Sequence, residues 1–201
     1  MELDNKLYQL IGQQAIRYGN GAHTKHKHLQ YHDFFIKRIP PDSRILDVGC
    51  ANGNLAFDIA AKISRVFIYA IDLNSALIEE ARKRFSRKNI NYVCGDALTA
   101  LPDQKFDVIL LSNVLEHLTP RTGFLKELKN RYHPGKFLIR VPIFERDWRV
   151  PLKKELGIEY RLDKTHRIEY RQEEFQTELK RAGLEINHFE VRWGEIWSEA
   201  V

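Results

Sequence analysis

The segment from Ile45 to Asn54, which reads ILDVGCANGN, restricts the fold of this chain more than any other. An apolar run ends in an Asp-x-Gly-x-x-x-Gly turn, and a helical pattern of apolar residues follows. This order predicts a buried strand, a tight turn and the first turn of a helix. Gly49 and Gly53 carry no Cβ, so a ligand can approach the backbone, and a helix start offers N–H groups to an electron-rich group. A glycine-rich turn alone is weak evidence, because many nucleotide-binding folds contain one.

Three further apolar runs also end in polar residues. They are Val66–Asp72, Ile90–Cys94 followed by Gly95-Asp96, and Phe106–Ser112 followed by Asn113. Asp72 lies 19 residues after Gly53, close to the spacing at which a carboxylate reaches ribose hydroxyls in strand–helix–strand cofactor sites. The runs therefore predict parallel strands of an open α/β sheet, which binds ligands at the carboxyl ends of its strands.

In order and spacing, these motifs resemble those of the class I S-adenosylmethionine-dependent methyltransferases. The match consists of LDVGCANG for the glycine turn, AIDLN for the ribose acid, CGDAL for the adenine-side acid and SNVLEHL after the fourth strand. It covers residues 40–142 and, more loosely, the C-terminal part. The resemblance implies a Rossmann-like, doubly wound α/β fold, with a seven-stranded sheet in the order 3-2-1-4-5-7-6 and the last strand antiparallel. A dehydrogenase is disfavoured, because Ala51 occupies the second glycine position of G-x-G-x-x-G.

The resemblance also implies S-adenosylmethionine as cofactor and S-adenosylhomocysteine as its product. Asp47 is expected to accept a hydrogen bond from the cofactor's ammonium group, or to fix the loop instead. Asp72 is expected to bind the ribose, and Asp96 with the Ala97 N–H the adenine. The expected cofactor contacts are Asp47, Gly49, Cys50, Ala51, Gly53, Asn54, Asp72, Leu73, Asp96, Ala97 and Asn113. Family members commonly have Gly-x where this chain has Ala51-Asn52, and alanine, the smallest replacement, is expected to be tolerated.

Glu116 and His117 follow the fourth strand, where the reacting methyl group would lie. An imidazole that titrates near neutrality can take a proton from a hydroxyl as that oxygen attacks. His117 is therefore the candidate general base, with Glu116 and His166 orienting it or the acceptor. A structural interpretation, in which Glu116 and His117 only open a helix, stays open.

A metal site is the competing interpretation of the same residues. In small-RNA 3′-end 2′-O-methyltransferases and ubiquinone-pathway O-methyltransferases, E-x-x-E-H plus a distal His can hold a divalent cation. Glu116, His117 and His166 match three of those positions. Asn113 replaces the first carboxylate, which removes a charge and weakens a site for hard cations, so a site without metal is the first expectation.

The chain of 201 residues predicts a single methyltransferase domain. Residues 1–39 are expected to form a helical lid that carries Lys27, His28, Tyr31 and His32, although a solvated basic face would look the same. Residues 143–170 are expected to form a substrate-recognition insertion. There Arg140, Arg146 and Arg149 would bind an anion, and Trp148 and Tyr160 would stack on a ring; a salt-bridged surface loop is the alternative.

Composition limits partners and location. No apolar run is long enough to cross a membrane, no secretory signal is recognised, and two cysteines give no disulfide framework, so a cytoplasmic location is expected. The net charge of +5 permits an anionic small-molecule substrate without indicating nucleic acid. We expect methyl transfer to an oxygen of a small polar or anionic metabolite such as a sugar or acid. An RNA 2′-O-methyltransferase and a non-catalytic cofactor-binding module remain alternatives, and the oligomeric state is not determined.

Overall fold

The computed structural model describes residues 2–19, 24 and 28–201, and the chain divides into two compact units, Met1–Arg38 and Ile39–Val201. The first unit contains α1 (Glu2–Tyr18) and the short α3 (His32–Ile36). Both helices agree with the helical character expected of residues 1–39. Lys27 lies outside the described residues, and the lid role of this unit stays a prediction.

The second unit is built on one seven-stranded sheet in the order β3-β2-β1-β4-β5-β7-β6. Its strands are β1 (Arg44–Val48), β2 (Phe67–Asp72), β3 (Ile90–Cys94), β4 (Val108–Ser112), β5 (Lys136–Pro142), β6 (Ile186–Arg192) and β7 (Glu195–Ala200). The first five strands pair in parallel, and β7 runs antiparallel to both β5 and β6. The predicted fold class, strand order and antiparallel last strand are confirmed.

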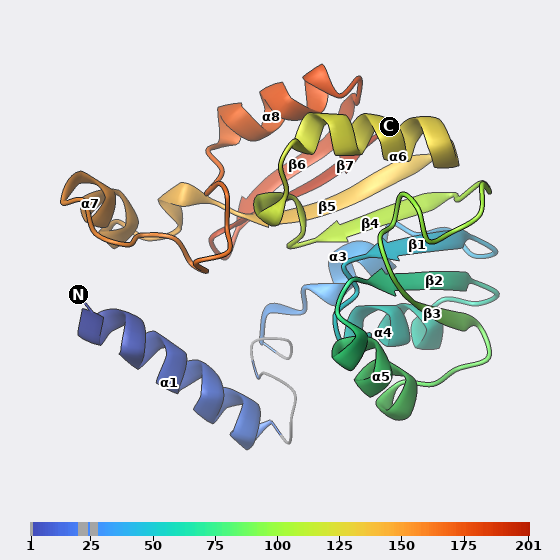
Figure 1. Cartoon of the computed structure of the whole chain (residues 1–201), viewed down its shortest axis with the longest axis horizontal. Helices are drawn as coiled ribbons and strands as arrows, with labels where there is room; N and C mark the ends of the chain where they lie inside the picture. Colours follow the sequence, from blue (N-terminus) through green and yellow to red (C-terminus); the bar gives the residue numbers. More distant parts are fainter. Residues whose placement is uncertain (1, 20–23, 25–27) are drawn as a thin grey trace. The chain divides into compact units, whose positions relative to one another are not determined.

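Helices cover both faces of this sheet (Figure 1). On one side lie α4 (Asn54–Lys62) and α5 (Ser75–Arg84), on the other α6 (Arg121–Tyr132) and α8 (Gln172–Arg181). Alternate residues of the central strands point toward α6 and α8, so that Leu46 of β1 and Ile109 of β4 join one buried cluster with Leu125 and Phe175 of these helices. Burial on both faces explains why these strands read as continuous apolar runs. None of the described helices is long and apolar enough to cross a membrane.

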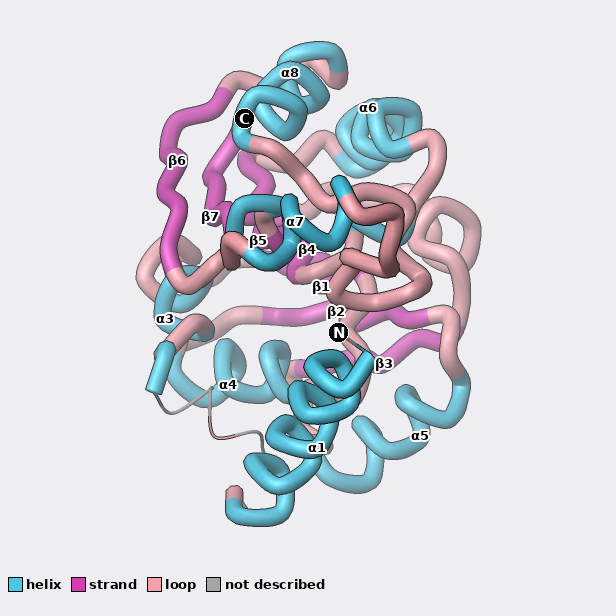
Figure 2. Tube along the Cα trace, turned by 90° about the vertical axis from the view of Figure 1, so that its left-hand side faces the viewer, coloured by secondary structure: helices cyan, strands magenta, loops and turns pink. Residues whose placement is uncertain are grey.

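The segment between β5 and α8 holds structure that its polar sequence did not predict. It contains the 3₁₀ turn η2 (Phe144–Arg146) and the helix α7 (Arg149–Glu155). A parallel bridge joins Ile143 to Tyr170, so the two ends of this excursion meet. Figures 1 and 2 place α7 beyond the carboxyl ends of β4 and β5. The excursion therefore lies at the edge of the sheet where the polar residues gather.

Candidate functional site

The glycine turn between β1 and α4 is shaped by close packing within the protein. A Cβ added at Gly49 would lie 2.7 Å from Val114, and one at Gly53 would lie 2.6 Å from the hydroxyl of Tyr92. Gly53 also begins α4 in the left-handed conformation, with φ +80°. Both glycines are thus required by neighbouring side chains and by the backbone, in addition to any ligand that approaches.

Asp72 joins the end of β2 to this turn. One of its carboxylate oxygens accepts a hydrogen bond from the Ala51 N–H (2.9 Å) and the other from the Asn74 N–H (2.8 Å). Ala51 itself has a φ of +48°, in the left-handed region that favours glycine. The side chain of Leu73, next to Asp72, is 73% exposed. Three of the residues expected to contact a cofactor therefore lie together on the loops after β1 and β2.

Asp47, near the end of β1, is a buried carboxylate with an incomplete set of hydrogen bonds. Its side chain is buried, and Oδ2 has no hydrogen-bond partner. Burial, with a smaller contribution from the negative charge of Asp72, raises the pKa of Asp47 to about 7. The backbone N–H groups of Gly49 and Cys50 donate to the carbonyl of Ile71 instead. The structure thus gives no hydrogen bond from these N–H groups to Asp47 that would fix the loop, and its carboxylate is left for a donor from outside the chain.

Two other expected cofactor residues follow β3. The exposed Asp96 accepts a hydrogen bond from the Leu98 N–H (2.7 Å), while the carbonyl of the buried Ala97 accepts one from the Tyr132 hydroxyl (2.5 Å). At the start of α4, no side chain caps the helix, so the first N–H groups, from Asn54 onward, point toward the turn without a capping acceptor.

The third group of polar residues follows β4, in the 3₁₀ turn η1 (Leu115–His117). Asn113 precedes it with a φ of +58°, and its side-chain oxygen accepts a hydrogen bond from Arg140 Nε (2.8 Å). Glu116 is fully buried, and neither carboxylate oxygen has a hydrogen-bond partner. Burial raises the pKa of Glu116 to about 7, against the lowering effect of His166 and Arg140. An apolar core residue would be expected at such a position, so the burial of Glu116 is consistent with its prediction as a site residue.

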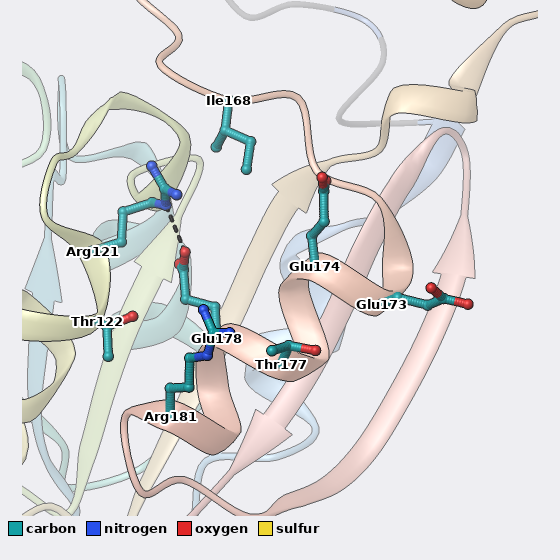
Figure 3. Close-up of a pocket in the computed structure, with 8 residues that line it drawn as sticks. All are labelled: Arg121, Thr122, Ile168, Glu173, Glu174, Thr177, Glu178 and Arg181. Carbon is teal, nitrogen blue, oxygen red and sulfur yellow. Dashed lines mark hydrogen bonds and ion pairs between the residues drawn. The ribbon is translucent and has the colours of Figure 1, made fainter.

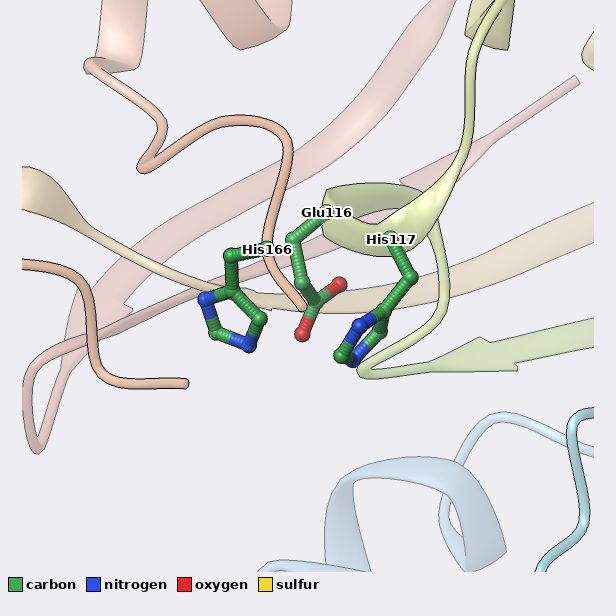
Figure 4. A group of neighbouring side chains, drawn as sticks. All are labelled: Glu116, His117 and His166. Carbon is green, nitrogen blue, oxygen red and sulfur yellow. The ribbon is translucent and has the colours of Figure 1, made fainter. Parts of the chain in front are cut away.

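His166 reaches this turn from the excursion after β5. The Arg167 N–H donates to the carbonyl of Glu116 (2.7 Å), which fastens the excursion to η1. The rings of His117 and His166 pack edge to face with centroids 4.7 Å apart. Figure 4 shows the Glu116 carboxylate between the two imidazoles. Burial and the neighbouring His166 lower the pKa of His117 below its ordinary value, so this ring is neutral at pH 7.

Two residues that the sequence did not single out complete the cluster. The buried Glu169 accepts a hydrogen bond from Nδ1 of His166 (2.9 Å), and the Thr165 hydroxyl contacts Nδ1 of His117 (2.9 Å). The sequence feature that could have identified Glu169 as the partner of His166 was their spacing of three residues. It is informative only in a helix, and this segment is not helical.

One nitrogen or oxygen from each of Glu116, His117 and His166 lies within 4.8 Å of the other two. Neighbouring ligands of a metal ion with bonds of about 2.1 Å are about 3.0–3.4 Å apart, so these atoms would have to move closer together, by up to about 1.5 Å, to bind one ion. Two imidazoles and a carboxylate are also a common donor set for divalent transition metals. The cluster can therefore act as a proton acceptor or as a metal site.

The arginines expected to bind an anion are engaged within the protein. Arg146 contacts Glu169 (2.5 Å), Arg149 contacts Asp147 (2.6 Å), and Arg140 contacts Asn113. Their roles in substrate binding stay predictions without support from this geometry. Trp148, by contrast, is 74% exposed.

A separate pocket of about 450 Å³ lies between the N-terminal part of α6 and the helix α8 (Figure 3). Arg121 and Glu178 form an ion pair on its wall (2.8 Å). The residues that line it are Arg121, Thr122, Ile168, Glu173, Glu174, Thr177, Glu178 and Arg181. None of these belongs to the loops after β1–β4, so this pocket is not the candidate site.

Comparison with known proteins agrees with this arrangement. Residues 45–135 match the family model "Methyltransferase domain". An uncharacterized methyltransferase of Mycobacterium bovis is 32% identical over 92 residues, which are 45% of this chain and 46% of that protein. A fatty-acid O-methyltransferase of Mycolicibacterium smegmatis is 33% identical over 112 residues, 54% of this chain and 40% of that protein. The chain thus spans less than half the length of these relatives.

The similarity of fold extends beyond the matched segment. A SAM-dependent methyltransferase from Aquifex aeolicus superimposes with a TM-score of 0.65 at 18% identity, covering 96% of this chain and 98% of that one. At this identity the likeness concerns the fold, and it includes the strands after residue 135.

Proposed function

This chain carries a class I S-adenosylmethionine-dependent methyltransferase domain, and we propose that it transfers a methyl group to an oxygen of a small polar or anionic metabolite. S-Adenosylmethionine, when bound, supplies an electrophilic methyl group. The observation that carries the proposal is the fully buried and unpartnered Glu116, which follows β4 and lies beside the imidazoles of His117 and His166. The mycolicibacterial relative is a fatty-acid O-methyltransferase, which supports an oxygen acceptor and favours an acid over a sugar.

The residues of the turn fit the cofactor. The unpartnered Oδ2 of Asp47 would accept a hydrogen bond from an ammonium group, and a positive charge there would favour the ionised carboxylate. Asp72 would bind the ribose hydroxyls, and Asp96 and Ala97 would bind the adenine. Leu73 would cover the adenine ring. The uncapped start of α4 would face the electron-rich end of the ligand.

His117 is the proposed general base. A neutral imidazole is the form that accepts a proton, and the lowered pKa of His117 keeps it in that form at pH 7. Glu116 would stabilise the imidazolium that forms, and His166 would orient the acceptor hydroxyl. Much of the rate would still come from holding the acceptor oxygen in line, because methyl transfer depends chiefly on positioning.

Transfer of a labelled methyl group into fractionated metabolites of a cell lysate tests this proposal. We expect label in small acidic metabolites with the wild-type protein and about 10²- to 10⁴-fold less with His117→Ala. His188→Ala, a histidine of β6 away from η1, is the matched control. Label in the RNA fraction would favour the RNA 2′-O-methyltransferase instead, and no transfer to any fraction would favour a non-catalytic module.

A metal-assisted reaction is the second candidate, because the unpartnered Glu116 and two imidazoles provide the donor set described above. A bound divalent ion would polarise the acceptor oxygen. Under this alternative, treatment with a chelator abolishes methyl transfer and Mg²⁺ or Mn²⁺ restores it. Full activity of the wild-type protein after exhaustive chelation would exclude the metal and leave His117 as the base.

A further inference from the structure

Each of the two histidines of the cluster has one ring nitrogen held by a defined partner. Nδ1 of His166 lies 2.9 Å from Oε1 of Glu169, and both residues are buried. Glu169 is fixed in turn, because its Oε1 also accepts from the Leu162 N–H (2.6 Å) and its Oε2 from Arg146 (2.5 Å). A carboxylate surrounded by donors can only accept, so Nδ1 of His166 carries the proton.

The Thr165 hydroxyl imposes the same state on His117. Its proton is donated to Asp163 Oδ1 (2.7 Å), and that carboxylate also accepts the Thr165 N–H (2.8 Å). With its proton committed, the hydroxyl oxygen can only accept from Nδ1 of His117, at 2.9 Å. The proton of His117 therefore also lies on Nδ1.

We propose that Glu169 and the Thr165–Asp163 pair are positioning residues that hold both imidazoles as Nδ1–H tautomers, leaving Nε2 of each ring as the lone-pair donor of the cluster. The inference rests on the proposed function and deepens it, because only a nitrogen with a lone pair can take a proton from the acceptor or bind a metal ion. It also gives the excursion after β5 a definite task. The excursion contributes His166 to the cluster, and its residues Glu169 and Thr165 set the tautomers of His166 and of His117 in η1.

Nitrogen-15 NMR of the ring nitrogens in the full-length protein, labelled on histidine, tests this assignment directly. Spectra are recorded at about pH 8, where unpaired histidines are neutral, and signals are assigned by comparison with His117→Gln and His166→Gln. In the wild-type protein we expect a protonated Nδ1 and an unprotonated Nε2 for both residues. A protonated Nε2 on either ring overturns the proposal for that ring. The variants serve only to assign the signals, and the tautomers are read from the wild-type protein.

Two substitutions separate the two arms. Thr165→Val should shift His117 toward the Nε2–H tautomer and leave His166 unchanged. Glu169→Ala should shift His166 toward the Nε2–H tautomer and leave His117 unchanged. Glu159→Gln, which alters an acid of the same segment that pairs with Arg161, is the matched control and should change neither ring. Tautomers that persist in both variants would show that other groups set them. Because the measurement needs no cofactor or substrate, the expected tautomers without methyl transfer would refute the proposed function alone.

Discussion

The turn after β1 and the cluster after β4 lie at the same edge of one sheet, yet they are built differently. The turn is local: its residues come from one stretch around Gly49–Gly53, and its long-range ties are backbone N–H groups that donate to Ile71 and Asp72. The cluster is assembled from segments almost 50 residues apart, and its ties run between side chains, as in the pairs of His117 with Thr165 and of His166 with Glu169.

The difference extends to the burial of charge. Each region contains one buried carboxylate with an unpartnered oxygen, Asp47 in the turn and Glu116 in the cluster, and burial raises the pKa of both to about 7. Leaving such groups unsatisfied costs stability. Under the proposed function these two carboxylates are kept for ligands, Asp47 for the cofactor and Glu116 for the reaction.

Removing the cluster without touching the turn should have the largest effect. His117→Ala is expected to lower kcat for methyl transfer about 10²- to 10⁴-fold, because the loss is confined to the transition state. S-Adenosylmethionine affinity, measured by calorimetry, should remain within about twofold. A variant that loses cofactor affinity as well would show that the two regions are not separable.

Asp47 offers a test of the turn that needs no ligand. Its pKa of about 7 in the folded protein exceeds that of the unfolded chain, so the folded state binds more protons between about pH 4 and pH 7. Stability should therefore fall as pH rises through this window, by up to about 4 kcal/mol, and then level off. Glu116, whose pKa is also raised to about 7, contributes a slope of the same sign. Chemical denaturation at several pH values should therefore show a shallower slope in Asp47→Asn than in the wild-type protein, and the part that remains comes from Glu116. An unchanged slope in that variant would mean that other groups produce it.

Asp72→Ala should remove the cofactor while leaving the cluster intact. Loss of two charge-assisted hydrogen bonds to the ribose should weaken S-adenosylmethionine binding about 100-fold. The tautomers of His117 and His166 should not change. Asp103→Ala, an exposed acid on the loop before β4, is the control and should bind normally. Unaltered calorimetric affinity in Asp72→Ala would overturn the ribose assignment.

The smallest expected effect is the change in thermal stability on replacing Ala51, whose backbone is strained, with glycine. Ala51 has a φ of +48°, which costs a non-glycine residue about 1–2 kcal/mol. Ala51→Gly relieves this strain but adds freedom to the unfolded chain, so we expect a net gain of about 0.5–1 kcal/mol. Thermal unfolding should show a Tm about 1–4 °C higher. A lower Tm would mean that the packing of the Ala51 methyl group outweighs the strain.

The sequence by itself determined the parts of this protein that depend on local patterns. Apolar runs ending in Asp47, Asp72 and Gly95-Asp96 predicted the parallel strands, and the glycine turn predicted the start of α4. The strand order came from the resemblance to a family, because periodicity does not specify which strands are neighbours. The roles of the individual site residues stay predictions.

Tertiary structure decided what depends on contacts between distant segments. Only the fold shows that Glu116 is fully buried without a partner, that Arg146 is held by Glu169, and that Thr165 faces His117. The helix α7 was missed because its short, polar sequence has no clear helical period. A side chain's partners and its loss of water are set by the whole packed structure, so they cannot be read from neighbours along the chain.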